Sequence, residues 1–352
     1  MKEKKYLYIF ILLIIIFVGF HFITWNLFTK ELFNYKDNMR VGDLGRMSYL
    51  IKSLTLRKDE QNLQFKHIQY DNNSEIDVLT IGDSFSNGGG GGNNQYYQDH
   101  ISTIQNLKVM NIQHSNKGFI ETVLILNSNG TLDRLKPKFI ILQSVERSAI
   151  SRYSKIIDWD IGSKKNSTQF LHKKYDSLKP KPLFINNLNY NALLYSILYN
   201  YDDNAIFSKT YVAHLTKNLF SCNDKNKLLF YFEDLKNISQ SNDKSLNLLN
   251  NNLNKLQNIL NEKNIELYFM PAVDKYNLYS KYIENNKYPK SKFFETLRPL
   301  KKEYNFIDTK KILEEMLDNN VSDVYYSDDT HWSWKASNKI FSKIKFQKTS
   351  EY

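Results

Sequence analysis

Two short segments of this 352-residue chain carry residue types that together could perform nucleophilic chemistry. The first, Gly82-Asp83-Ser84, directly follows the apolar run 77–81, which predicts a buried strand ending in a tight turn. A serine there lies at the carboxyl edge of a sheet, where open α/β folds bind ligands. Serine is a poor nucleophile without an adjacent base, and a lone turn serine more often caps a helix. A reactive Ser84 therefore needs a partner from elsewhere in the chain.

The second segment, near the C-terminus, supplies a candidate base. It reads Asp328-Asp329-Thr330-His331-Trp332, and His331 is the one histidine of seven that stands among acids and aromatics. A carboxylate two or three residues before a histidine can reach its Nδ1–H, fix its tautomer and stabilise the imidazolium. The residues predict Ser84 as nucleophile and His331 as base, with Asp329 and Asp328 both open as the third member.

The elements that must position these residues follow from the hydrophobic pattern. Short apolar runs predict strands over 77–81, 107–113, 139–142, 265–270 and 304–307. Apolar residues at helical spacing predict helices over 120–126 and 246–260. Strands that alternate with helices indicate a three-layer α/β/α domain around a mostly parallel sheet, here over 75–347.

Two stretches of this domain depart from the alternation. Residues 151–235 are rich in Asn, Lys and Tyr and contain the apolar segments 192–198 and 228–232, which predicts an insertion or cap on the sheet. The glycine run Gly88–Gly92 predicts a local flexible loop.

Together these motifs resemble the SGNH hydrolase superfamily, in which Gly-Asp-Ser comes early and Asp-x-x-His late. Asp329-Thr330-His331-Trp332 resembles, more specifically, the periplasmic alginate O-acetyltransferases. Residues 139–147 (FIILQSVER) look like the strand and Glu-Arg of that family, and residues 271–279 (PAVDKYNLY) like its Pro-x-x-Asp-Lys-x-x-x-Tyr segment. All four motifs sit at predicted strand ends, so we expect them to converge on one edge of the sheet.

The order of the motifs differs from that of the alginate enzymes, in which Asp-x-His precedes Gly-Asp-Ser. Here Gly-Asp-Ser comes first and Asp-Thr-His-Trp last, a cyclic shift that favours a relative over direct membership. The alginate-type pattern aligns Asp329 with the triad acid, whereas the general SGNH spacing aligns Asp328. We prefer Asp329.

The resemblance also implies groups around the nucleophile. An oxyanion hole in this superfamily uses the serine N–H, a loop glycine and an asparagine, which Gly118 and Asn116 could supply. The usual Gly-x-Asn-Asp is missing after the third strand, so Gln143 or Arg147 becomes the candidate replacement. The alternative for Arg147 is an ion pair with Glu146 or a neighbour. Two further residues of the resemblance, Lys275 and Tyr279, would bind glycan or order the site, and Tyr279 could equally pack in the core.

The N-terminus predicts a membrane anchor. Residues 1–5 contain three lysines and one glutamate. Residues 6–28 contain no Asp, Glu, Lys or Arg, and this run is long enough to cross a bilayer as a helix. The alternative is a cleaved signal peptide, but the apolar run is longer than usual and no small-x-small site follows it. Residues 29–74 read as a connector. Basic residues before the span predict a single-pass protein with its N-terminus inside and its catalytic domain periplasmic or extracellular.

Composition excludes other classes of function. The net charge of +11 is spread as single lysines, without the basic run typical of nucleic-acid binding. The single cysteine, Cys222, excludes an intrachain disulfide and a cysteine-rich zinc site, and we expect it in the core. We expect no metal and no cofactor.

The function that the resemblance implies is O-acetylation of a cell-surface or exported polysaccharide through an acyl-serine. A multi-spanning membrane acyltransferase would deliver the acyl group. Three alternatives stay open: a carbohydrate esterase or deacetylase built on the same triad, D-alanyl transfer to teichoic acid, and a non-catalytic glycan-binding or assembly protein. The presence of Ser84, His331 and both acids argues against the last.

Overall fold

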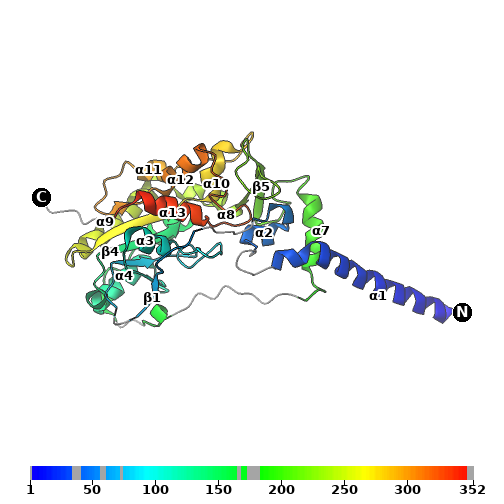
Figure 1. Cartoon of the computed structure of the whole chain (residues 1–352), viewed down its shortest axis with the longest axis horizontal. Helices are drawn as coiled ribbons and strands as arrows, with labels where there is room; N and C mark the ends of the chain where they lie inside the picture. Colours follow the sequence, from blue (N-terminus) through cyan, green and yellow to red (C-terminus); the bar gives the residue numbers. More distant parts are fainter. Residues whose placement is uncertain are drawn as a thin grey trace.

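The computed structural model describes residues 2–33, 41–55, 61–71, 74–164, 168–172 and 183–346. A long N-terminal helix, α1 (Lys2–Leu27), extends away from a body in which helices surround a central sheet (Figure 1). The sheet has six strands in the order β1-β3-β2-β4-β7-β8, and every neighbouring pair is parallel. Their bounds are β1 Ile68–Gln69, β2 Val78–Ile81, β3 Val109–Ile112, β4 Phe139–Val145, β7 Glu266–Ala272 and β8 Asn305–Phe306.

The mostly parallel α/β sheet predicted from the sequence is confirmed, and each of the five predicted strands overlaps an observed one. The chain moves from β2 to β3 on one side and then returns to β4 on the other side of β2. This reversal of direction makes the carboxyl end of β2 a topological switch point, the place where ligands bind in open α/β sheets. Ser84 follows β2 by three residues.

Two groups of helices cover the sheet. In the first, α13 (Trp334–Lys343) packs against α3 (Tyr97–Gln105) and α12 (Thr309–Asp318). In the second, α6 packs against α9 and α4, and α11 packs against α9. Because right-handed crossovers in opposite directions place their helices on opposite faces, the two groups form the outer layers of an α/β/α sandwich. The bounds of the second group and of α5 beside it are α4 Phe119–Ser128, α5 Thr131–Leu135, α6 Glu146–Tyr153, α9 Asp243–Asn261 and α11 Phe293–Leu297.

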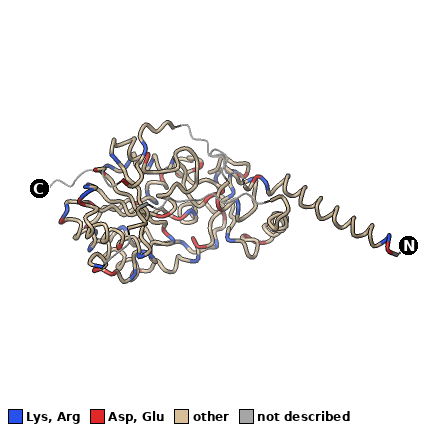
Figure 2. Tube along the Cα trace, turned by 90° about the horizontal axis from the view of Figure 1, so that it is seen from below, with Lys and Arg blue, Asp and Glu red and all other residues tan. Residues whose placement is uncertain are grey.

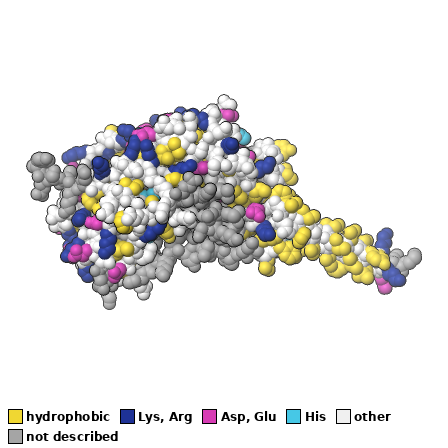
Figure 3. All heavy atoms as spheres, viewed as in Figure 1, with side chains coloured by type: hydrophobic (Ala, Val, Ile, Leu, Met, Phe, Trp, Pro, Cys, Tyr) yellow, Lys and Arg dark blue, Asp and Glu magenta, His cyan; other side chains and the backbone are white. Residues whose placement is uncertain are grey.

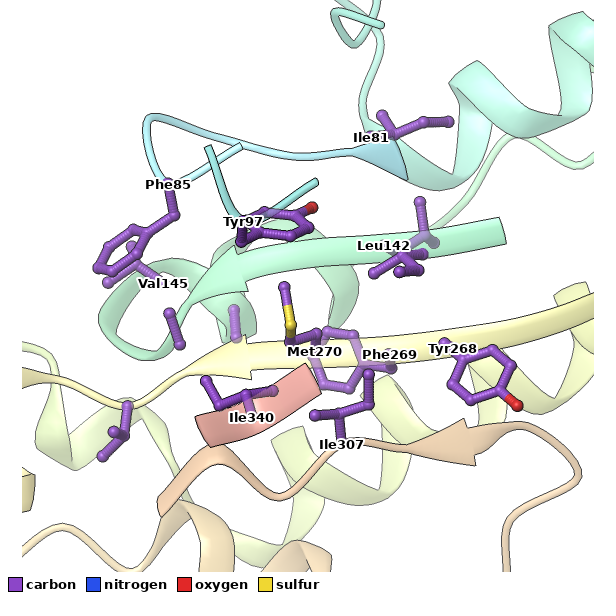
Figure 4. Packing of buried hydrophobic residues seen from close by; sticks show 14 of the residues in the cluster. Ile81, Phe85, Tyr97, Leu142, Val145, Tyr268, Phe269, Met270, Ile307 and Ile340 are labelled. Carbon is purple, nitrogen blue, oxygen red and sulfur yellow. The ribbon is translucent and has the colours of Figure 1, made fainter. Parts of the chain in front are cut away.

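The core lies between the strands and these helices. Strands β2, β3 and β4 are buried along their whole length, as expected of a parallel sheet covered on both faces. Figure 4 shows buried side chains on both faces of the sheet, among them Leu142 of β4, Phe269 and Met270 of β7 and Ile340 of α13. The predicted core position of Cys222 agrees with its burial.

The insertion predicted at 151–235 contains a separate two-stranded antiparallel sheet and two helices. Its elements are α7 Leu188–Leu198, β5 Thr210–His214, β6 Lys227–Tyr231 and α8 Phe232–Lys236. The helix α10 (Lys275–Tyr279) contacts β6 and α8, and this contact joins the insertion to the end of β7.

Helix α1 is the one helix of the described chain that is long and apolar enough to cross a membrane. Figure 2 marks the charged residues of this helix, which lie at its N-terminal end. After it come η1 (Thr29–Phe33) and α2 (Asp43–Ser48), which contact each other. The segment 29–74 is more than a connector, because it also contributes the edge strand β1 and, through α2, a wall of the candidate site.

Candidate active site

The nucleophile turn after β2 is held by its own aspartate. Asp83 Oδ1 accepts from the Phe85 N–H at 3.1 Å, and Asp83 Oδ2 accepts from the Val145 N–H at 2.8 Å and from the Arg152 guanidinium. Burial disfavours the charged carboxylate, but Arg152 and these hydrogen bonds hold the pKa of Asp83 below its usual range. Asp83 therefore fixes Ser84 relative to the end of β4. No motif in the sequence indicated Arg152.

Gln143 of β4 holds the same turn from a second side. Its Oε1 accepts from the Asp83 N–H and from the Ser86 hydroxyl, both at 3.0 Å. A Cβ added at Gly82 would lie 2.4 Å from this oxygen and 2.0 Å from Ser86 Oγ, so only glycine fits. The Nε2 of Gln143 is buried and has no partner within the described chain. A buried Nε2 is not placed to meet a substrate oxygen, so the geometry favours a bracing role over the predicted oxyanion role.

The loop before α13 brings His331 to this turn. His331 Nε2 lies 2.7 Å from Ser84 Oγ, although the two residues are 247 positions apart in the sequence. On the other side of the ring, His331 Nδ1 lies 2.6 Å from Asp329 Oδ1. Asp329 Oδ1 also accepts from the backbone N–H of His331 at 3.0 Å. The ring of Phe85 packs beside the imidazole, and the ring of Trp332 packs edge-on against Phe85. The three side chains thus form the Ser-His-Asp hydrogen-bonded chain that activates a serine in acyl transfer.

Three carboxylates set the charge environment of the imidazole. Burial of His331 disfavours its protonated form, but Asp329, Asp43 and Asp83 outweigh burial and raise the pKa of His331. Asp43, the first residue of α2, accepts from the Thr330 N–H at 2.8 Å and from its hydroxyl at 2.5 Å. No sequence motif marked Asp43, because it lies 286 positions before Asp329, in the segment 29–74 that was predicted to be a connector.

Asp328 performs a different task from its neighbour. It is fully buried, and its Oδ2 accepts from the Gly42 N–H at 2.7 Å. Its backbone oxygen accepts from the Gly45 N–H at 2.8 Å. Asp328 therefore ties the histidine loop to the segment 41–55. The geometry thus favours Asp329, the residue preferred from the sequence, as the partner of His331.

The glycine run, expected to be only a flexible loop, packs against the imidazole. A Cβ added at Gly89 would lie 2.2 Å from His331 Nε2 and 2.3 Å from His331 Cδ2. The Gly89 N–H donates to the Ser84 carbonyl oxygen at 2.7 Å, which folds the loop back over the nucleophile. The closeness of the run to Ser84 in sequence was a signal for this contact, since only glycine lets a backbone approach a side chain so closely.

Lys275 and Tyr279 order the site from inside the protein. The Lys275 ammonium is buried and donates to the carbonyl oxygens of Tyr326, Ser327 and Asp329 at 2.7, 2.8 and 3.1 Å. Burial lowers the pKa of Lys275 to about 8, although nearby carboxylates oppose the shift. Of the two predicted roles, binding glycan and ordering the site, the position of Lys275 fits the second.

Tyr279 likewise lies out of reach of a substrate. It is fully buried, and its hydroxyl oxygen accepts from the Tyr325 N–H at 3.2 Å. Its ring stacks on Phe220 of the insertion. This is the core-packing alternative that the sequence left open.

Arg147 is held away from the nucleophile in a buried ion-pair cluster. It contacts Asp234 Oδ1 at 3.2 Å and Asp274 Oδ1 at 2.9 Å, and the pair raises its pKa. Burial in turn raises the pKa of both aspartates; the charge of Asp234 raises that of Asp274 further, and the charge of Asp43 raises that of Asp234. Glu146 accepts from the Asp274 N–H at 2.9 Å. The position of Arg147 therefore fits the alternative role, an ion pair that braces the loop, and not the predicted role in an oxyanion hole.

These contacts connect the four motifs of the sequence in a single series. Glu-Arg at the end of β4 contacts Asp274 after β7, Lys275 beside it contacts the histidine loop, and His331 contacts Ser84. The expected convergence on one edge of the sheet is therefore present. Only the last contact joins groups suited to acyl chemistry, and the others position that loop.

Two predicted oxyanion residues lie at the start of α4. Asn116 is exposed, and the Gly118 N–H already donates to the Ser115 carbonyl oxygen at 3.2 Å. By contrast, the Ser84 N–H has no accepting partner in the ranges that the structure describes. The geometry thus leaves Ser84 itself as the available backbone donor beside the hydroxyl.

One group of residues in the described chain has the spacing of a metal site. Ligand atoms of Asp43, Asp329 and His331 all lie within 4.8 Å of one another. These atoms already bind each other or Thr330, since His331 Nδ1 contacts Asp329 and Asp43 accepts twice from Thr330. A cation would have to displace the hydrogen bond that orients the imidazole. The cluster is therefore better explained by proton chemistry than by metal binding.

Comparison of the chain with protein-family models, curated proteins and solved structures finds no match. The resemblance to SGNH acyltransferases consequently stays a prediction carried by the motifs. The functional argument depends on the geometry of the site itself.

Proposed function

We propose that this chain is a membrane-anchored, serine-dependent O-acyltransferase that acetylates a cell-surface or exported polysaccharide. The observation that carries the proposal is the hydrogen-bonded series Ser84–His331–Asp329 at the switch point of the sheet. A hydroxyl 2.7 Å from a buried imidazole, itself fixed by a carboxylate, is the arrangement that generates a serine nucleophile.

The mechanism follows from these distances. His331 Nε2 takes the Ser84 proton as Ser84 Oγ attacks the acyl carbonyl carbon. The imidazolium then protonates the leaving group, and an acyl-serine remains. A sugar hydroxyl next gives its proton to His331 and attacks the same carbonyl carbon, and the imidazolium returns the proton to Ser84 Oγ as the acyl–serine bond breaks. Asp329 stays ionised and stabilises the imidazolium in both steps, and the Ser84 N–H supports the developing oxyanion.

The membrane helix supports the extracytoplasmic part of the proposal. Lys4 and Lys5 precede the apolar span of α1, so the positive-inside rule places the N-terminus in the cytoplasm. The catalytic domain then lies outside, beside the membrane. An acyl donor delivered there by a multi-spanning acyltransferase would reach Ser84 without leaving the membrane surface.

The proposal is tested first with p-nitrophenyl acetate as donor. We expect the full chain in detergent to release p-nitrophenol, and Ser84→Ala to lose the activity by about 10²–10⁴-fold. Equal rates for the two proteins would contradict the proposal. Oligosaccharides are then added as acceptors, and acetylated product is sought by mass spectrometry. Release of acetate without any acetylated sugar would instead assign the chain as an esterase.

A further inference from the structure

Helix α7 of the insertion carries an apolar face that the described part of the protein leaves largely uncovered. Tyr190, Leu193, Leu194, Ile197 and Tyr201 are all exposed. Their spacing follows one face of a helix, continuing past its last turn at Leu198. Soluble surfaces rarely gather large apolar side chains in this way.

Helix α7 and the residues directly before it carry no charge, and the first acids after it are Asp202 and Asp203. Residues 183–201 contain no Asp, Glu, Lys or Arg, and the flanking side chains Leu183, Phe184, Ile185, Ile206 and Phe207 are exposed as well. Figure 3 shows hydrophobic side chains along α1 and again on the adjoining part of the body. An exposed apolar patch of this kind marks a surface that contacts a membrane or another protein.

Helix α7 packs against the membrane helix α1, and this contact indicates that lipid covers the apolar face. The Asn189 amide lies 2.8 Å from His21 Nδ1, and the rings of Tyr190 and Phe20 stack at 4.7 Å between centroids. Both contacts fall on the last turns of α1, as Figure 1 shows. Any bilayer that surrounds α1 must therefore also meet α7.

The length of α1 gives the depth of that meeting point. From Tyr6, where the apolar span begins, to His21 the helix rises roughly 23 Å. A hydrocarbon core is about 30 Å thick. The contact with α7 therefore lies within about 7 Å of the outer boundary, at the depth where interfacial helices bind.

We propose that α7 and its flanks form a membrane-docking surface whose occupant is the outer leaflet of the lipid bilayer. The surface fixes the orientation of the catalytic domain. Tyr195 of α7 stacks on Tyr49 at the end of α2, and Asp43 at the other end of α2 binds the histidine loop. Because α2 is six residues long, about 9 Å, docking places the candidate site close to the membrane surface. This inference rests on the span of α1 and not on the proposed catalysis.

The test measures lipid contact in the full chain, reconstituted into vesicles of phosphatidylcholine and phosphatidylglycerol. A nitroxide is attached at Ile197→Cys or Tyr201→Cys in a Cys222→Ala background. The matched control is Ile156→Cys, since Ile156 is 96% exposed but lies outside α7 and its flanks. Accessibility to oxygen and to a water-soluble nickel complex then reports depth. We expect the label at Ile197 to lie about 5–10 Å below the headgroups, the label at Tyr201 to lie shallower and the label at Ile156 to remain in water.

Equal nickel accessibility at positions 197 and 156 would overturn the proposal. So would shielding of position 197 that appears in native membranes but not in protein-free vesicles, because a protein partner would then be the occupant. A second measurement needs no substitution. Vesicles carrying a diazirine in the acyl chain are irradiated with the unmodified chain, and we expect adducts in 183–207 as well as in α1. Adducts confined to α1 would also refute lipid docking.

Discussion

Replacing Gly89 by alanine tests the geometry of the proposed base most directly. The added Cβ would lie 2.2 Å from His331 Nε2, whereas ordinary van der Waals contact begins near 3.4 Å. The φ of Gly89 lies outside the left-handed region, so alanine fits the backbone and the collision falls on the imidazole. His331 must therefore move by about 1 Å, although Phe85 packs beside it and Trp332 packs against Phe85.

A shift of this size removes the 2.7 Å contact between His331 Nε2 and Ser84 Oγ. Because a misplacement of about 1 Å can cost roughly 10²-fold and a general base supplies about 10²–10⁴-fold, we expect kcat/KM for p-nitrophenyl acetate to fall within that range. The melting temperature should change little, since the new methyl group is small. Labelling of Ser84 by a fluorophosphonate should slow in parallel.

The matched control is Asn93→Ala, an exposed position four residues further along the same loop, which should leave kcat/KM unchanged. In a protein that also carries Ser84→Ala, Gly89→Ala should cost almost nothing more, because residues that act as a unit are not additive. A rate for Gly89→Ala within about threefold of the parent protein would refute the placement of His331 against the glycine run.

Three further predictions concern the histidine loop. Asp329→Asn should lower kcat by about 10²–10⁴-fold at an unchanged melting temperature. Asp328→Asn should mainly lower the free energy of unfolding, by about 1.5–3 kcal/mol measured in denaturant. The reverse pattern would make Asp328 the carboxylate partner of His331. Asp43→Asn removes one cause of the raised pKa of His331. Because the neutral imidazole is the base, the acid limb of the pH profile of kcat/KM should move to lower pH. An acid limb that does not move would exclude an effect of Asp43 on His331. Lys275→Met should lower the free energy of unfolding by about 1–3 kcal/mol and leave KM unchanged, whereas a raised KM at parental stability would restore a role in binding substrate.

The sequence predicted the sheet because its strands are short apolar runs that end in polar motifs. It predicted Ser84 and His331 because a nucleophile and its base must be specific residue types with neighbouring acids. The choice between Asp329 and Asp328 needed coordinates, since both can reach the imidazole and only the fold decides which carboxylate turns toward the segment 41–55.

The supporting residues were beyond prediction for a different reason. Arg152, in the last turn of α6, pairs with Asp83 after β2, and Asp43 contacts a loop 287 positions away, so no local pattern marks either residue. Arg147 and Lys275 were found by their motifs, but the sequence left two roles open for each. Their side chains face buried carboxylates and carbonyl oxygens, which depends on how the insertion folds over the end of β7.

The junction between α2 and the histidine loop has a consequence for any release of the protein from the cell surface. The segment 41–55 supplies Asp43 to Thr330, and its Ser53 carbonyl oxygen and Thr55 hydroxyl both contact Ser327. A protease that cut the chain after residue 55 would release a domain that still contains Ser84 and His331. That domain would no longer be covalently joined to segment 41–55, which helps to position the histidine loop. If segment 41–55 leaves with the anchor, the proposed acyl transfer would stop, so it would be confined to protein that is still attached to the membrane.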